Sequence, residues 1–94
     1  MVELVIEKKE YGFRLVLGEE GEESYFIKDR GEGIFSMIIE KDREMVDVID
    51  NRYENLGVTD INDLFHKLII TPQNILEMLL GEKPEIEKVI VEFD

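Results

Sequence analysis

The sequence predicts an α+β fold, with a mainly antiparallel sheet of about five or six strands covered on one face by two short consecutive helices. Three observations support this prediction. Apolar and polar residues alternate through most of residues 2–49, which is typical of strands that follow one another as a meander. Apolar residues then recur at helical spacing over residues 61–80. Strand spacing returns at residues 86–93, so the last strand is expected to be C-terminal.

The chain is expected to begin with a β-hairpin. Val2, Leu4 and Ile6 alternate with polar or charged neighbours over most of the first segment, and alternation resumes over residues 11–18 after the polar turn 8–10. One face of each strand is therefore apolar, and that face is expected to lie against the core.

Two turns separate the strands that follow. Residues 19–23 are four glutamates and one glycine, so we expect a solvated turn before a third strand at residues 24–28. Residues 29–33 contain two glycines and form the second turn. The segment 34–40 carries apolar side chains on both faces, which is typical of a strand deep in a sheet.

Residues 44–56 fit two structures. Met45, Ile49, Tyr53 and Leu56 fall at helical spacing, whereas the run 45–49 is rich in β-branched residues and poor in helix formers. We expect a strand over 44–49, paired with the preceding strand, and then a helical turn to Leu56. A helix over the whole segment stays open as the alternative.

The next two elements are expected to be short helices. Asp60 is a suitable N-cap for a helix with an apolar stripe, and Pro72 suits the first position of a second helix that ends near Leu80 and Gly81. The apolar stripe of the first helix is formed by Ile61, Leu64, Phe65 and Leu68.

Length and composition indicate that residues 1–94 form a single compact acidic domain. An apolar fraction of 44% is enough for one core, and the formal net charge is -12. Cysteine is absent, which is typical of a reducing compartment, so we expect a cytoplasmic protein. No apolar run approaches the roughly 20 residues that a membrane span requires, and no export signal is expected.

The residue types argue against catalysis and against a bound cofactor. The chain has one histidine, two serines and no cysteine, so an activated nucleophile with its base is not expected. Asp60, Asp63 and His66 follow one another at three-residue intervals and could share a metal ion on a helix. Helix capping by Asp60 and a helix-dipole role for Asp63 explain the same spacing, so neither an enzyme nor a metal site is predicted.

A second set of acidic residues also comes into consideration as a metal site. Asp47, Asp50 and Glu54 would share one face if their segment were helical, and such a face could hold Mg²⁺ or Ca²⁺. The spacing of an EF-hand loop is absent, and a solvated acidic face is the simpler interpretation.

The surplus of acids instead suggests a protein partner. We expect a small acidic binding protein that neutralises or escorts a basic protein, such as a toxin or a nucleic-acid-binding protein, in the manner of immunity-type inhibitors. Direct binding to nucleic acid is not expected, because phosphates would meet a negative surface. The candidate partner-binding residues are Glu19, Glu20, Glu22, Glu23, Asp47, Asp50 and Glu54.

A homodimeric structural or chaperone-like module is the alternative function. Residues 65–80 carry more apolar side chains than two short helices need against one sheet face. Part of this surface, or an open sheet edge, could form a contact between two copies of the chain.

Overall fold

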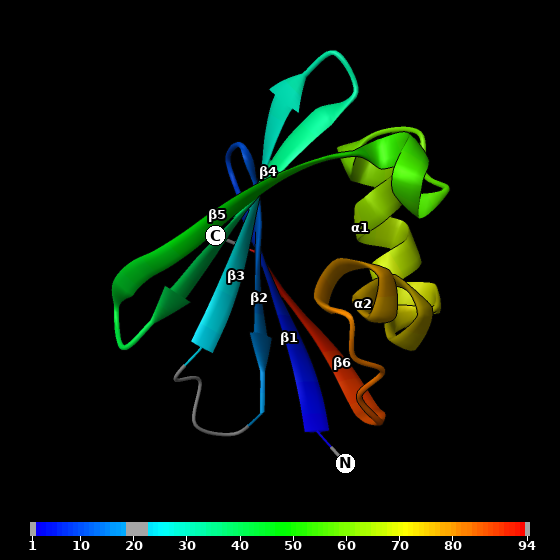
Figure 1. Cartoon of the computed structure of the whole chain (residues 1–94). Helices are drawn as coiled ribbons and strands as arrows, with labels where there is room; N and C mark the ends of the chain where they lie inside the picture. Colours follow the sequence, from blue (N-terminus) through cyan, green and yellow to red (C-terminus); the bar gives the residue numbers. More distant parts are fainter. Residues whose placement is uncertain (1, 19–22, 94) are drawn as a thin grey trace.

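The computed structural model describes residues 2–18 and 23–93, and over these residues it contains one six-stranded sheet with the order β5-β4-β3-β2-β1-β6 (Figure 1). The α+β class and the mainly antiparallel pairing are confirmed. In chain order the elements are β1 Val2–Lys9, β2 Gly12–Leu17, β3 Glu23–Gly31, β4 Ile34–Lys41, β5 Glu44–Arg52, the 3₁₀ helix η1 Tyr53–Leu56, α1 Ile61–Ile70, α2 Pro72–Leu80 and β6 Ile86–Phe93.

The first five strands form an antiparallel meander, and the last strand closes the other side of the sheet. β1 to β5 pair with their neighbours in chain order. After the helices, β6 pairs with β1 in the parallel direction. The return of the C-terminal strand to the sheet is confirmed, and its parallel pairing makes the sheet mixed. Within the described chain, β5 and β6 are therefore the two edge strands.

A tight turn explains why residues 44–52 form a strand. Asp42 and Arg43 both have positive φ, at 53° and 69°, as the two central residues of a type I′ hairpin turn do. Such a turn sends the chain straight back along β4, so β5 pairs with β4 along most of its length. The predicted strand at 44–49 is confirmed and extends to Arg52, and the helical alternative for the whole segment is wrong. The helical turn that ends at Leu56 is the 3₁₀ helix η1.

The helix boundaries follow the expected signals. The side chain of Asp60 accepts a hydrogen bond of 2.8 Å from the backbone N–H of Asp63, which satisfies a free donor at the start of α1. Pro72 opens α2, and Gly81 ends it with a left-handed φ of 77°. Gly57 ends η1 in the same left-handed region.

The core lies between the sheet and the helices, which Figure 1 shows on the same side of the sheet. Its members on α1 and α2 include Leu64, Leu68 and Leu76, which are buried together with Leu4 and Ile6 of β1. Full burial of one such side chain contributes roughly 1.5–3 kcal/mol. The buried apolar residues are Leu4, Ile6, Phe13, Leu15, Ile27, Phe35, Met37, Tyr53, Leu56, Val58, Leu64, Phe65, Leu68, Ile75 and Leu76.

Burial stops before the β5 edge. Every residue of β5 is exposed except Asn51, which is half-buried. β4 by contrast buries Phe35, Ser36 and Met37, in agreement with the prediction that this strand lies inside the sheet. The helices therefore do not extend over the whole face of the sheet, and the expected cover is incomplete at β5.

β2 and β3 approach each other so closely at Gly12 that there is no room for a side chain. A Cβ atom at this position would lie 1.8 Å from the carbonyl oxygen of Ile27, so any larger side chain must displace the β3 backbone. We expect Gly12→Ala to lower the free energy of unfolding by about 1–3 kcal/mol. Urea denaturation measures this change, with the exposed Glu10→Ala in the adjacent turn as control. A Gly12→Ala protein as stable as the wild type would contradict the described pairing.

Candidate functional site

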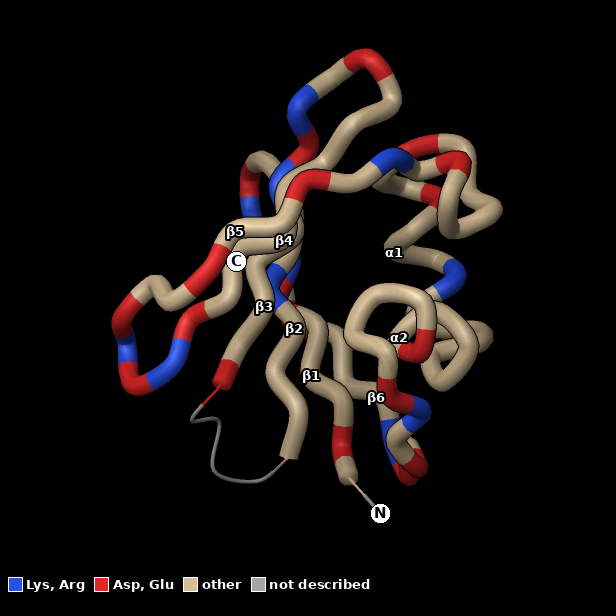
Figure 2. The backbone as a smooth tube through the Cα atoms, in the orientation of Figure 1, with Lys and Arg blue, Asp and Glu red and all other residues tan. Residues whose placement is uncertain are grey.

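Among the described residues, the acids are spread over several elements. Figure 2 shows them along β5, in the β4–β5 turn, near the start of α1 and after α2, with lysines and arginines between several of them. Of the seven candidate partner-binding residues, Glu19, Glu20 and Glu22 lie outside the described residues. The other four are Glu23, Asp47, Asp50 and Glu54, and all four are exposed.

The structure separates these four carboxylates. Asp47 stands opposite Ile39 in the β4–β5 register and Asp50 stands opposite Ser36, so the two aspartates project from opposite faces of the sheet. Glu54 lies beyond the strand in η1. The shared acidic face that a helix would have produced does not exist, because a strand places residues three apart on opposite sides.

Asp50 is engaged within the chain. The hydroxyl of Ser36 donates a 2.6 Å hydrogen bond to Asp50 Oδ1, and Arg30 Nε donates a 2.8 Å hydrogen bond to Ser36 Oγ. Arg30 is the extra residue of a register shift between Asp29 and Gly31. The Arg30 guanidinium and the Asp50 carboxylate share one buried hydroxyl, so Asp50 is the weakest of the predicted contact residues.

Side chains also cap the β5 edge. Asp47 Oδ1 accepts a 2.9 Å hydrogen bond from the backbone N–H of Val48, and Asn51 Oδ1 accepts a 2.8 Å hydrogen bond from that of Arg52. Edge strands with free N–H groups pair readily with other strands. These caps reduce that tendency, and they give Asp47 a structural role that the sequence pattern did not indicate.

The helix-free face of the sheet has an internal ion-pair network at its centre. Arg14 Nη2 lies 3.2 Å from Glu40 Oε1, and Arg14 Nη1 lies 3.8 Å from Glu7 Oε1. The guanidinium carbon also lies 5.7 Å from the centre of the Phe26 ring. Arg14 of β2 thus forms ion pairs with two acids of its own chain.

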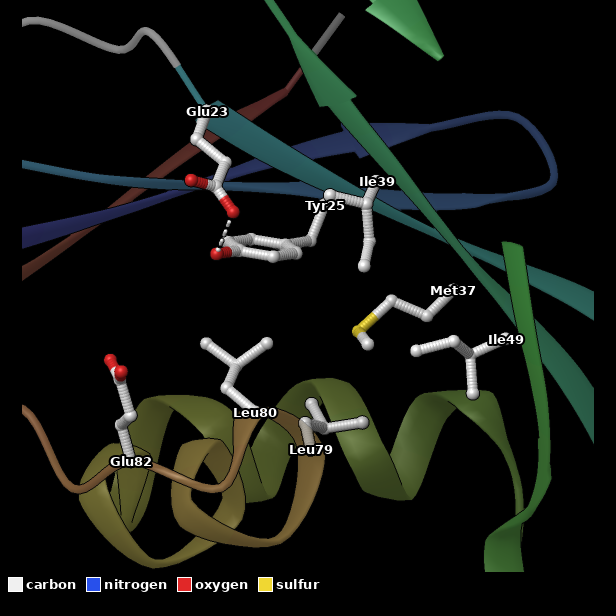
Figure 3. Close-up of a pocket in the computed structure, with 8 residues that line it drawn as sticks. All are labelled: Glu23, Tyr25, Met37, Ile39, Ile49, Leu79, Leu80 and Glu82. Atoms are coloured by element: carbon white, nitrogen blue, oxygen red, sulfur yellow. Dashed lines mark hydrogen bonds between the residues drawn. The ribbon is translucent and has the colours of Figure 1, made fainter. Parts of the chain in front are cut away.

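A groove opens where the helices end and β5 begins. It has a volume of about 320 Å³ and lies between α2 and the β3–β4–β5 end of the sheet (Figure 3). Met37, Ile39 and Ile49 line it from the sheet, and Leu79 and Leu80 line it from the helix. Apolar surface is exposed here because α2 stops short of the edge strand.

One end of the groove is anionic. Glu23, at the start of β3, and Glu82, just after α2, line it beside Tyr25, as Figure 3 shows. The Tyr25 hydroxyl donates a 2.7 Å hydrogen bond to Glu23 Oε1. Burial raises the pKa of Tyr25, and the hydrogen bond to Glu23 and the charges of Glu23 and Glu82 raise it further. The tyrosine therefore stays protonated and orients the Glu23 carboxylate.

Only one residue of this groove was among the sequence-predicted contacts. Glu23 was predicted from the acidic run before the third strand, whereas Glu82 and Tyr25 carried no signal of their own. Of the apolar segment 65–80, Leu79 and Leu80 of α2 line the groove. Ile69, Ile70 and Met78 are exposed elsewhere on the helices.

Asp60 and Asp63, considered above as metal ligands, have roles at the start of α1. Asp60 caps α1, and Asp63 Oδ2 accepts a 3.0 Å hydrogen bond from the backbone N–H of Thr59. His66 is exposed, with its ring centre 5.9 Å from that of Phe65. Among residues 2–18 and 23–93, no group of three His, Cys, Asp or Glu side chains is placed to hold a metal ion.

Comparison of the chain with protein-family models, with curated proteins and with solved structures found no match. Within the described ranges, no helix has the length and apolar character needed to cross a membrane.

Two tyrosines make the stability of the fold dependent on alkaline pH. Burial raises the pKa of Tyr53, as does the 2.6 Å hydrogen bond that its hydroxyl donates to Asp29 Oδ1. Tyr25 shifts in the same direction. An unfolded tyrosine loses its proton near pH 10, while both folded tyrosines still hold theirs, so unfolding becomes easier as pH rises above about 10.

We expect the contribution of these two tyrosines to the free energy of unfolding to be constant below pH 9 and to fall above pH 10. For the buried Tyr53 the limiting slope is about 1.4 kcal/mol per pH unit. Urea denaturation of the wild type and of Tyr25→Phe/Tyr53→Phe between pH 8 and 11.5 measures the difference. Equal pH slopes in the two proteins would show that neither phenol is held protonated by the fold.

Proposed function

We propose that this chain is a small acidic binding protein that neutralises or escorts a basic protein. The proposal assigns it binding and no catalytic step. It is supported chiefly by the β5 end of the sheet, where exposed apolar side chains stand among carboxylates in a chain with a net charge of -12. The exposed apolar residues of this strand are Met45, Val46, Val48 and Ile49.

The two kinds of side chain have different consequences for binding. Surplus negative charge raises the rate at which a basic protein finds this surface, and the effect weakens as salt screens it. Exposed apolar side chains contribute affinity once their surface is removed from water. Exposed apolar side chains on the same strand as these acids favour a partner with both basic and apolar side chains.

Affinity capture tests the proposal. The immobilised protein is expected to retain basic proteins from a lysate of its host at 50 mM salt and to lose most of them at 500 mM salt. Quantitative mass spectrometry of the bound fraction gives the isoelectric points of the retained proteins. The proposal would be contradicted if no basic protein were retained, or if the amount retained were the same at both salt concentrations.

A matched pair of variants locates the effect. Glu23→Gln/Asp47→Asn/Glu54→Gln removes three of the predicted contact charges and is expected to lower capture about tenfold. The control Glu10→Gln/Glu85→Gln/Glu87→Gln removes as many exposed carboxylates from other places and is expected to cause a smaller loss. Equal losses would mean that net charge alone drives binding.

A homodimeric structural or chaperone-like module is the second candidate. The exposed β5 edge and the exposed Ile70 of α1 favour it, since both are apolar surfaces that a second copy could cover. The side-chain caps on the β5 backbone and the repulsion between two chains of charge -12 argue against it.

Sedimentation decides between the two candidates. We expect a monomer at micromolar concentration and physiological salt, because a stable dimer would have to bring two strongly negative chains together. Sedimentation equilibrium between 1 and 100 µM measures the mass directly. A mass twice that of the chain over this whole concentration range would favour the homodimeric module over the acidic binding protein.

A further inference from the structure

The groove beside α2 combines two chemical environments over a short distance. In Figure 3 the carboxylates of Glu23 and Glu82 lie at the Tyr25 end, while Met37 and Ile49 lie toward the other end. Ile39, Leu79 and Leu80 provide apolar surface between them. A ligand that fits both ends must carry a positive charge and an apolar part.

No lysine or arginine lines this groove within the described residues. Lys83 Nζ lies 3.9 Å from Oε2 of Glu77, a carboxylate outside the groove lining. Lys41 stands opposite Glu23 in the β3–β4 register but is exposed and outside the lining. The two groove carboxylates are thus available to a cation from another molecule.

The volume and shape limit what that cation can be. About 320 Å³ is near the lower bound of ligand sites, which is roughly 300 Å³, and suits a few side chains better than a folded element. Lysine and arginine carry their charge at the end of an aliphatic stem, so the stem can lie on apolar surface while the head reaches a carboxylate. Arginine can also donate two hydrogen bonds to one carboxylate.

We propose that this groove is the site at which the basic partner is recognised, and that it takes a lysine or arginine side chain together with an adjacent apolar side chain of that partner. The cationic head lies between Glu23 and Glu82, and the apolar neighbour packs on Ile39, Ile49 and Leu79. This inference rests on the proposed function and names the part of the surface that performs it.

The Tyr25 hydroxyl has a supporting role in this site. By donating to Glu23 Oε1 it fixes one oxygen of that carboxylate and leaves the other oxygen for the incoming donor. A carboxylate held in place by the fold loses less conformational entropy on binding than a free glutamate side chain. Tyr25 is therefore a positioning residue.

A short peptide tests the site without knowledge of the natural partner. The probe is acetyl-Leu-Arg-Leu-Lys-Leu-amide, titrated into the ¹⁵N-labelled protein at 50 mM salt and followed by ¹H–¹⁵N correlation spectra. We expect the largest shifts at the groove residues Tyr25, Ile39, Ile49, Leu79 and Leu80. Peptides with glutamine in place of the cations, or glycine in place of the leucines, are expected to bind more weakly.

Two matched pairs of variants separate the charged and apolar contributions. Glu23→Gln/Glu82→Gln is expected to weaken peptide binding about tenfold, whereas Glu10→Gln/Glu87→Gln removes the same charge outside the groove and is expected to change it little. Ile49→Thr is expected to weaken binding, while Val48→Thr is not. Ile49 and Val48 are adjacent and similarly exposed, at 42% and 43%, but face opposite sides of the sheet.

Three results would overturn the groove assignment. These are shifts centred on the helix-free face of the sheet, equal losses in both members of each variant pair, and groove shifts that arise from protein concentration alone. The last result would place a second copy of the chain in the groove. Unfolding of a variant is excluded by its own correlation spectrum before titration.

The same variants distinguish failure of the site from failure of the function. If the wild type captures a basic protein and Glu23→Gln/Glu82→Gln captures it equally well, the groove assignment is wrong and the proposed function stands. If the peptide binds in the groove but no basic protein is captured, the proposed function is wrong and the groove remains a site for cationic, apolar side chains.

Discussion

The structure depends on the burial of one sheet face by helices that are too few to cover it. Strands about 4.8 Å apart place the edge strands of this sheet roughly 24 Å from each other, and a helix with its side chains is about 10 Å wide. α1 and α2 have only ten and nine residues. The buried core reaches from β1 to β4, and burial ends before β5. The groove beside α2 is the direct result of this mismatch in width.

The edge strand that is left uncovered needs protection from unwanted pairing. β5 carries exposed apolar residues, which in an isolated strand would favour aggregation. Carboxylates along the strand and the side-chain caps of Asp47 and Asn51 oppose this. Acidic residues thus have a role in the monomer as well as the proposed role in binding, so the net charge alone does not identify a binding surface.

Distance decides which carboxylates matter for a bound partner. Salt screens exposed charges over about 8 Å at physiological ionic strength, so most of the 23 acids act on a partner only as it approaches. Acids that line a groove beside apolar surface act at contact distance. The sequence placed Glu23 among the candidates because it belongs to an acidic run, but Glu82 follows α2 far along the chain. Only folding brings the two to one end of the groove.

By itself, the sequence determined most of the elements and the ends of the two helices. Alternating apolar residues specified the strands, and Asp60, Pro72 and the glycines after η1 and α2 specified the helix boundaries, because these signals act within a few residues. The tertiary structure decided the rest: the extension of β5 to Arg52, the parallel pairing of β6 with β1, and the placement of Asp47 and Asp50 on opposite faces. These depend on contacts between residues distant in the chain, which local periodicity does not encode.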